Sequence, residues 1–172
     1  MTDRSLFTDR TSLYSAIEES LRGGLRALQL REKELTIREL LSMAQELREI
    51  TLRHGAKLFI NDRVDVAIAA GADGVHLGQS SIPASAAKKI TKGRLLVGVS
   101  THSLKEAVQA EKDGADFITF GPIYHTPSKL KYGEPLGTDA LREATSEVSL
   151  PVLAIGGITP ERVKEVIESG SS

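Results

Sequence analysis

Six short apolar runs, separated by segments with helical periodicity, constrain the fold of this chain more than any other feature. The runs cover residues 25–30, 57–60, 74–77, 95–99, 117–120 and 152–155. Most are continuously apolar rather than alternating, which is typical of parallel strands whose two faces are both covered. Strands that alternate with helices predict an α/β fold with a parallel sheet and right-handed crossovers.

The segments between the runs carry helix signals. Helices are expected at residues 12–22, 37–53, 104–112 and 160–168. Glycines that can adopt the left-handed C-cap conformation close four helical stretches, at Gly24, Gly71, Gly114 and Gly170. Two of these glycines begin the same tripeptide, Gly-Ala-Asp. A closed barrel and an open doubly wound sheet both fit this pattern.

Composition narrows the class of protein. The chain has 172 residues, 40% hydrophobic and 26% charged, which is ordinary for one globular domain, so we expect a single domain over residues 1–172. A net charge of −1 gives no general attraction to nucleic acid or to an anionic membrane. Cysteine is absent, and no apolar run reaches the ~20 residues of a membrane span. A cytoplasmic protein is therefore expected.

Cations follow the first apolar run. Strand alternation places Gln29, Arg31 and Lys33 on one side of the chain. This trio suits a di- or triphosphate, because arginine binds oxygens through parallel bonds and lysine adds a mobile charge. A solvated charged turn accounts for the same residues equally well.

Two further runs end in residues suited to ligands. Asn61 and Asp62 can orient a ligand amide or hold Mg²⁺, although Asp62 can instead cap the next short helix. Gly156 and Gly157 expose backbone amides where a helix begins. That arrangement favours a phosphate cradle over a tight turn that merely needs glycine.

The stretch after the run at 117–120 has no periodic apolar pattern and is expected to be a loop over the site. Its polar groups are Thr126, Ser128 and Lys129, and an exposed basic loop is the alternative. His125 beside it is a candidate general acid or base. His76, inside an apolar run, either faces a ligand or fills a niche in the core.

Taken in order, seven motifs resemble thiamine-phosphate synthase and its paralogue, thiazole tautomerase. They lie at residues 29–33, 60–62, 72–79, 98–100, 114–116 with 121–122, 126–129 and 154–158. The resemblance runs from residue 2 to residue 172 and implies a (β/α)₈ barrel of the TIM type. Within this chain we expect that barrel to be incomplete, with a short first strand and without the eighth strand and helix. The unpaired edges would favour self-association into a homo-oligomer.

The resemblance also implies a reaction and the residues that perform it. Aminopyrimidine-methyl diphosphate and thiazole phosphate are joined, and diphosphate leaves with the help of Mg²⁺ and basic residues. Matching positions imply that Gln29, Arg31, Lys33, Asn61 and Lys129 contact the diphosphate or the pyrimidine, that Asp62 is one Mg²⁺ ligand, that Ser100 lies near the reacting methylene and that Gly157 is part of the thiazole-phosphate cradle. We therefore expect Ser100 and Lys129 to be catalytic, together with His125 as the candidate acid or base. The further substrate-binding residues that we expect are His76, Thr126, Ser128 and Gly156.

Departures from the synthase pattern keep two alternatives open. The synthase normally has a second Mg²⁺ carboxylate shortly after Gly78-Gln79, where Ser80-Ser81 stand here. A thiazole tautomerase needs no metal and would use His125 or His76 as its proton shuttle, but its usual catalytic histidine is replaced here by Pro122. The third interpretation is a paralogue that binds thiamine phosphate without turnover.

Overall fold

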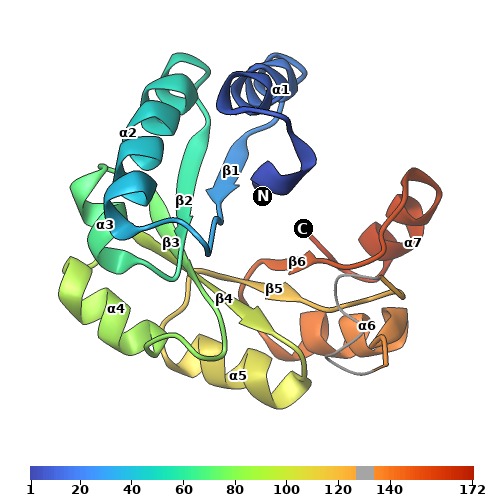
Figure 1. The fold of residues 1–172 in the computed structure, drawn as a ribbon. Helices are drawn as coiled ribbons and strands as arrows, with labels where there is room; N and C mark the ends of the chain where they lie inside the picture. Colours follow the sequence, from blue (N-terminus) through green and yellow to red (C-terminus); the bar gives the residue numbers. More distant parts are fainter. Residues whose placement is uncertain (127–133) are drawn as a thin grey trace. The chain divides into compact units, whose positions relative to one another are not determined.

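The structure is a computed structural model, and it describes residues 1–126 and 134–172. The chain divides into two compact units (Figure 1). Unit 1 comprises residues 1–76 and 91–96, and unit 2 comprises residues 77–90 and 97–172. The strands follow chain order in each, as β1-β2-β3 and β4-β5-β6. The α/β class with parallel strands is confirmed, whereas the single domain over residues 1–172 stays a prediction.

Unit 1 has three parallel strands covered by helices. Its elements are η1 (Arg4–Leu6), α1 (Arg10–Arg22), β1 (Ala27–Leu30), α2 (Ile37–Arg53), β2 (Lys57–Asn61), α3 (Val64–Ala69) and β3 (Gly74–Leu77), whose last residue belongs to unit 2. The register pairs Leu28 with Leu58 and Asn61 with His76. Helix α2 packs against β2 and α3, and its Leu47 is fully buried.

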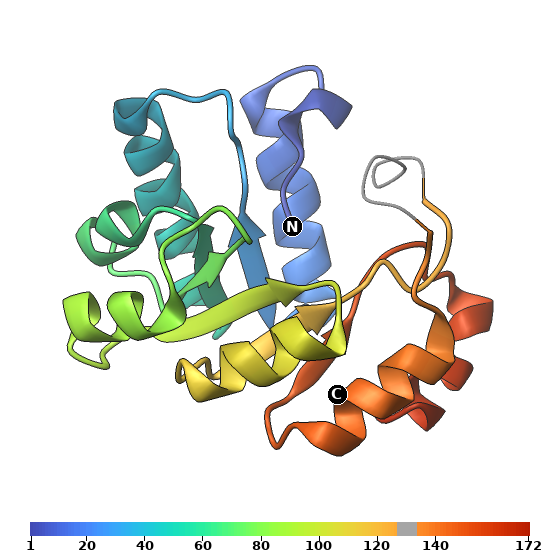
Figure 2. The ribbon, with the colours of Figure 1, turned by 90° about the horizontal axis from the view of Figure 1, so that it is seen from below.

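Unit 2 repeats this arrangement. Its elements are α4 (Ala84–Thr91), β4 (Leu96–Thr101), α5 (Leu104–Lys112), β5 (Phe117–Phe120), α6 (Gly137–Glu147), β6 (Val152–Ala154), η3 (Pro160–Arg162) and α7 (Val163–Glu168). Thr91 of α4 and Leu96 of β4 belong to unit 1. Helices α5 and α6 lie side by side, α5 against β5 and α6 against β6 (Figure 2).

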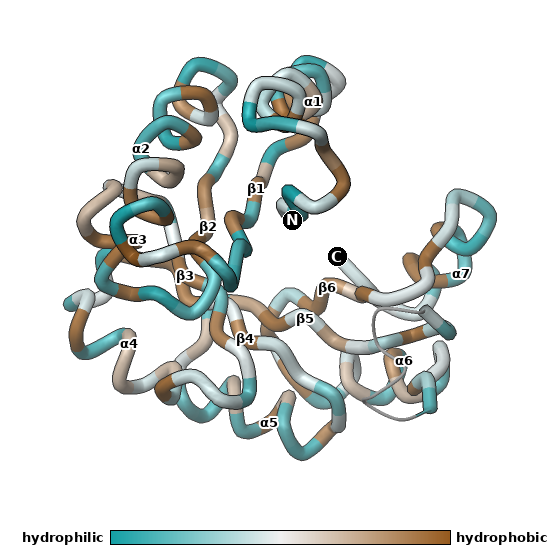
Figure 3. The backbone as a smooth tube through the Cα atoms, in the orientation of Figure 1, coloured by the Kyte–Doolittle hydropathy of each residue, from teal (hydrophilic) through white to brown (hydrophobic). Residues whose placement is uncertain are grey.

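The apolar residues of the runs form the core of each unit. In Figure 3 hydrophobic colour follows the strands, while the helices alternate between hydrophobic and hydrophilic residues. Leu58 and Ile60 of β2, and Ile118 of β5, are completely buried. All the predicted strands are confirmed, with ends shifted by at most two residues. None of the described helices combines the length and apolarity that a membrane crossing requires.

The predicted helix boundaries are mostly confirmed. Ser103 caps α5 by accepting the N–H of Glu106 at 3.2 Å, but the Glu106 carboxylate bonds the N–H of His102 rather than that of the cap. The helix expected at residues 160–168 opens instead as the 3₁₀ helix η3, and α7 follows it. Thr159, which precedes η3, makes no side-chain cap bond. The four helix-closing glycines all have positive φ. The sequence pattern set no bounds for helices α3, α4 and α6.

The first Gly-Ala-Asp tripeptide ties β2 to the start of β3. The Asp73 carboxylate accepts the N–H of Leu58 at 2.8 Å and a hydrogen bond from the Arg48 guanidinium at 2.6 Å. The backbone N–H of Asp73 in turn donates to the Leu58 carbonyl at 2.9 Å. One aspartate therefore joins two neighbouring strands and a cation of α2.

The second tripeptide repeats these contacts in unit 2. The Asp116 carboxylate accepts the N–H of Val97 at 2.6 Å and pairs with Lys88 of α4. Its backbone N–H donates to the Val97 carbonyl at 2.8 Å. Hydrogen bonds to a charged group are stronger than neutral ones. Asp73 therefore fixes the start of β3 beside β2, and Asp116 fixes the start of β5 beside β4.

Residues 171 and 172, which follow Gly170, lie along β6. The N–H of Ser172 donates to the carbonyl of Val152 at 2.9 Å, and the Ser171 hydroxyl accepts the N–H of Ala154 at 3.0 Å. The chain thus meets the edge of β6 immediately after α7.

We predict that Asp73→Ala lowers the free energy of unfolding by about 2 kcal/mol, because it removes a charge-assisted hydrogen bond and leaves the Arg48 guanidinium unpaired. Urea unfolding followed by circular dichroism measures the change. Asp139→Ala is the matched control, since Asp139 is 99% exposed and pairs only with Arg142 among the described residues. The control should change stability by less than about 0.5 kcal/mol. Equal effects of the two substitutions would contradict the proposed role of Asp73.

Candidate functional site

A polar network joins the carboxyl ends of the three strands of unit 1. The Gln29 side-chain amide at the end of β1 donates to the Asn61 Oδ1 of β2 at 3.0 Å and lies 2.9 Å from the His76 Nδ1 of β3. The Asn61 amide donates to the Asp62 carboxylate at 2.7 Å. The structure thus brings four predicted site residues into one chain of hydrogen bonds.

His76 is held in this network as a buried residue, 6% exposed. With the Gln29 amide donating, its Nδ1 accepts, which leaves the ring proton on Nε2 in the neutral form. A buried histidine within a polar network agrees with both alternatives considered for His76, that it contacts a ligand and that it fills a niche in the core.

Asp62 has an unusual backbone conformation, with φ of 60°. Its N–H donates to the carbonyl of His76 at 2.9 Å, so the strand pairing holds the residue in this left-handed region. The interpretation of Asp62 as a helix cap is wrong, because α3 is preceded by Arg63 and has no side-chain cap bond. Its carboxylate is directed by Asn61 instead.

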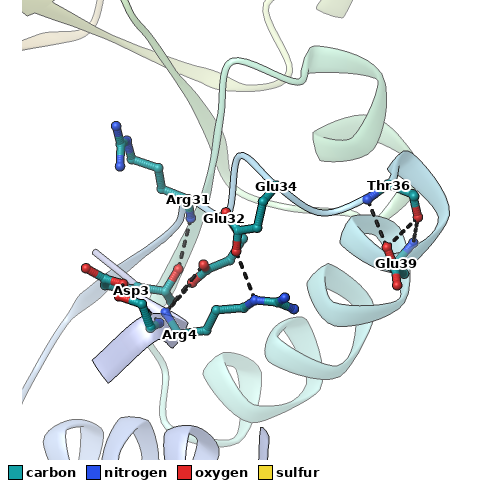
Figure 4. Close-up of polar contacts among 9 residues, drawn as sticks. Asp3, Arg4, Arg31, Glu32, Glu34, Thr36 and Glu39 are labelled. Atoms are coloured by element: carbon teal, nitrogen blue, oxygen red, sulfur yellow. Dashed lines mark hydrogen bonds and ion pairs between the residues drawn. The ribbon is translucent and has the colours of Figure 1, made fainter. Parts of the chain in front are cut away.

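Arg31 and Lys33 follow β1 on a loop. Figure 4 shows Arg31 and Glu32 of this loop beside Asp3 and Arg4. The Arg31 N–H donates to the Thr2 hydroxyl at 3.0 Å, and Glu32, 6% exposed, accepts the N–H of Arg4 at 3.1 Å. The Arg31 side chain extends away from Arg4 and Glu32 in Figure 4. Among the described residues, neither Arg31 nor Lys33 has an ion-pair partner, so both cations remain available to an anion.

Glu32 is a site-supporting residue that the sequence analysis missed. The alternation that places Arg31 and Lys33 on one side also places Glu32 on the other, and this was the available signal. A buried carboxylate requires hydrogen bonds, which the amide of Arg4 supplies.

Ser100 lies near the end of β4 among hydroxyl and amide groups of unit 2. Its carbonyl accepts the Gln79 side-chain amide at 2.5 Å, and its hydroxyl lies 3.5 Å from the Thr119 hydroxyl of β5. Where the synthase pattern has a carboxylate, the Ser81 hydroxyl accepts the N–H of Gly78 at 2.8 Å. Ser81 closes its own turn rather than offering a metal ligand with negative charge.

Gly156 and Gly157 pack directly against the turn that follows β5. A Cβ on Gly156 would lie 2.7 Å from the Cα of Pro122, and one on Gly157 would lie 2.5 Å from the carbonyl oxygen of His125. Both glycines also have positive φ, 100° and 65°. Close approach and backbone conformation therefore both require glycine here.

The carbonyls of this glycine turn are bonded, whereas its amides are not. The N–H groups of Ile123 and Tyr124 donate to the carbonyls of Ile155 and Gly156 at 2.9 and 3.0 Å. The N–H groups of Gly156, Gly157 and Ile158 donate to no acceptor among residues 1–126 and 134–172. Unpaired successive amides are the donors from which anion-binding turns are built.

The remaining predicted residues lie beside this glycine turn or outside the described residues. His125 is 67% exposed at its side chain, with Nε2 3.6 Å from a Glu134 carboxylate oxygen. Thr126 is half-buried next to it. Ser128 and Lys129 lie outside the described residues. Within the described residues, no cluster of three or more histidine, aspartate or glutamate side chains is arranged to hold a metal ion.

The family model described as thiamine monophosphate synthase matches residues 1–172. The chain belongs to this family. The thiamine-phosphate synthases of Clostridium novyi and Chloroflexus aurantiacus are 41% and 43% identical to it, each covering 99% of this chain, which spans 83% and 78% of their lengths. A solved thiamine phosphate pyrophosphorylase from Pyrococcus furiosus has a TM-score of 0.88 at 38% identity, covering 98% of this chain and 79% of that one.

These matches confirm the family resemblance inferred from the seven motifs. The chain has the α/β architecture that the resemblance implied, and polar residues follow its parallel strands. The network of unit 1 and the glycine turn of unit 2 are the two groups of candidate residues. The roles assigned to individual residues stay predictions.

We predict that Gly156→Ala lowers the free energy of unfolding by about 3 kcal/mol, because the added methyl group is strained by the positive φ and collides with Pro122. Gly93→Ala is the control, since Gly93 has φ of 71° but nothing within 4 Å of the added Cβ. Strain alone should cost the control about 1 kcal/mol. Thermal and urea unfolding would contradict the proposed packing if the two variants were equally stable.

Proposed function

We propose that this protein is a transferase of thiamine biosynthesis that joins aminopyrimidine-methyl diphosphate to thiazole phosphate. The observation that carries the proposal is the 41–43% identity to thiamine-phosphate synthases over nearly the whole chain. In this reaction the bond between the pyrimidine methylene carbon and the diphosphate oxygen breaks, and the diphosphate leaves with the bonding electrons. A bond forms between that carbon and the thiazole nitrogen, giving thiamine phosphate.

The network of unit 1 suits the pyrimidine diphosphate. Gln29 and Asn61 present side-chain amides that can orient the ring, and Arg31 and Lys33 supply positive charge for the leaving diphosphate. Stabilising charge that develops on a leaving group is the electrostatic contribution expected to dominate such a reaction. Lys129, with Thr126 and Ser128, is proposed to contribute from the loop beyond β5.

The glycine turn of unit 2 suits the thiazole phosphate. Its support is the set of unpaired amides at Gly156, Gly157 and Ile158, which are donors for phosphate oxygens. Ser100 is proposed to lie near the reacting methylene, where its hydroxyl can interact with the developing cation. His76 is assigned to substrate binding through its contact with Gln29, and His125 is the candidate proton-transfer group.

Mg²⁺ fits the residues of unit 1 as an ion shared with the diphosphate. Asp62 would hold it with a carboxylate that Asn61 orients, and Mg²⁺ in phosphate sites commonly uses one or two carboxylates, substrate oxygens and water. When bound, Mg²⁺ would neutralise charge on the leaving diphosphate. Ser81 supplies no second carboxylate, so we expect weaker metal binding than a two-carboxylate site provides.

The finer features of the fold and its setting are proposals as well. Parallel strands in chain order, with helices between them, support a (β/α)₈ barrel. We propose a cytoplasmic enzyme whose partners are small phosphorylated molecules, without nucleic acid or membrane. We also propose that the protein forms a homo-oligomer.

We predict that the protein forms thiamine phosphate from both substrates and that this activity requires Mg²⁺. Product formation measured by thiochrome fluorescence, with Mg²⁺ or with EDTA, tests the proposal. Exchange of thiazole tautomers without metal would replace it by thiazole tautomerase, for which Ser81 in place of a carboxylate is the specific support. Binding of thiamine phosphate without either reaction would identify a non-catalytic paralogue.

We predict that Arg31→Ala, Lys33→Ala and Lys129→Ala each weaken binding of the pyrimidine diphosphate by ~1.5–3 kcal/mol, the contribution of a charge-assisted hydrogen bond. Isothermal titration calorimetry measures the loss, and unfolding should change little for the two described cations because neither has an ion-pair partner among the described residues. Arg53→Ala is the control, since Arg53 is an exposed cation paired with Glu18 on the surface. Unchanged affinity in all three variants would make these residues a solvated surface.

A further inference from the structure

The orientation of the amides in the glycine turn follows from what holds its carbonyls. A trans peptide unit is planar, so the carbonyl of one residue and the N–H of the next point in opposite directions. The carbonyls of Ile155 and Gly156 are held by backbone N–H groups of the turn after β5. These two bonds fix the N–H directions of Gly156 and Gly157.

The third carbonyl of the turn is held by a side chain. The Arg162 guanidinium donates from Nη1 to the carbonyl of Gly157 at 2.7 Å. By the same planarity, this bond directs the N–H of Ile158 to the opposite side. Glycine at 157 has wide conformational freedom, so without this bond the third peptide unit is the least restrained of the three.

Arg162 is itself positioned by the Tyr124 ring, which Glu165 holds in turn. Its guanidinium carbon lies 4.3 Å from the centre of the Tyr124 ring, a cation–π contact. The Tyr124 hydroxyl donates to Glu165 at 2.8 Å, and Thr138 at the start of α6 donates to the same carboxylate at 3.2 Å. The bond to Glu165 raises the pKa of Tyr124, so its hydroxyl remains a donor at neutral pH.

A helix dipole cannot substitute for this arrangement. The segment after the glycine turn begins as the three-residue helix η3, and α7 starts only at Val163 and has six residues. The macrodipole of such short helices is small, and its effect is confined to the first turn. Phosphate affinity must therefore come from the direction of the individual amides.

We propose that Arg162, stacked on Tyr124, is a positioning residue that presents the Ile158 amide to the phosphate of the thiazole substrate. The inference rests on the proposed function, because it deepens the role of the glycine turn. Arg162 acts through the backbone of Gly157. It should affect the phosphorylated thiazole and leave the pyrimidine diphosphate unaffected.

The experiment compares Arg162→Gln, Arg162→Lys and wild type in binding thiazole phosphate, inorganic phosphate and pyrimidine diphosphate by calorimetry. Arg162→Gln should weaken binding of the thiazole and inorganic phosphates on the order of tenfold, the effect of one lost charge-assisted hydrogen bond. Arg162→Lys, which keeps a charged donor, should recover part of this loss. Arg142→Gln on α6 is the control, an exposed arginine paired with Asp139.

Nuclear magnetic resonance separates positioning from a general structural effect. In wild type, the Ile158 amide resonance should shift downfield on addition of phosphate, and this shift should shrink in Arg162→Gln while the thermal unfolding midpoint stays unchanged. Equal affinities in wild type and Arg162→Gln, or equal losses for all three ligands, would overturn the inference. Weakened phosphate binding in a protein that makes no thiamine phosphate would leave the inference standing and overturn the proposed function.

Discussion

Pairing of parallel strands is the constraint on which both groups of candidate residues depend. Along each pair of strands the backbone amides and carbonyls are hydrogen-bonded to one another, and this pairing ends where the chain turns toward a helix. At these ends the remaining backbone groups and side chains become available. In unit 1 the groups at the strand ends are the side chains of Gln29 and Asn61. In unit 2 they are the backbone amides of the glycine turn. The two units use different chemistry at the same position of the strand.

The difference between the units follows from how closely neighbouring segments approach. The turn after β5 lies so near Gly156 and Gly157 that no Cβ fits, and only backbone groups can face a ligand there. After β1 and β2 the candidate groups are side chains, the amides of Gln29 and Asn61 and the cation of Arg31. A rigid backbone cradle suits a compact phosphate, while mobile cations suit a diphosphate that must be bound and then released.

Much of the fold could be predicted from the sequence, because a strand buried on both faces must be apolar throughout, as residues 57–60 and 117–120 are. The glycine turn was also visible, since Gly156-Gly157 follows a strand and precedes a helix start. Contacts between residues distant in sequence were not visible. Nothing in the sequence near Glu32 shows that its carboxylate accepts the backbone N–H of Arg4. The Gly-Ala-Asp tripeptide likewise does not show that Asp73 bonds Leu58 and Arg48. The alternative that Asp62 caps the next helix was wrong, and the hydrogen bond from its N–H to His76 of β3, which accompanies its positive φ, could not be read from the sequence.

Ser81 stands where the family resemblance leads us to expect a metal-binding carboxylate, and its contact has a local physical consequence. A serine hydroxyl that accepts the N–H of Gly78 closes a tight turn, and a neutral oxygen used in this way contributes no charge toward a cation. In the proposed reaction, neutralising the diphosphate would then depend more heavily on Arg31, Lys33 and the single carboxylate of Asp62. Because Arg31 and Lys33 have no ion-pair partner among the described residues, their charge is not already compensated within the protein. The balance of charges therefore remains compatible with diphosphate departure even with one metal ligand fewer.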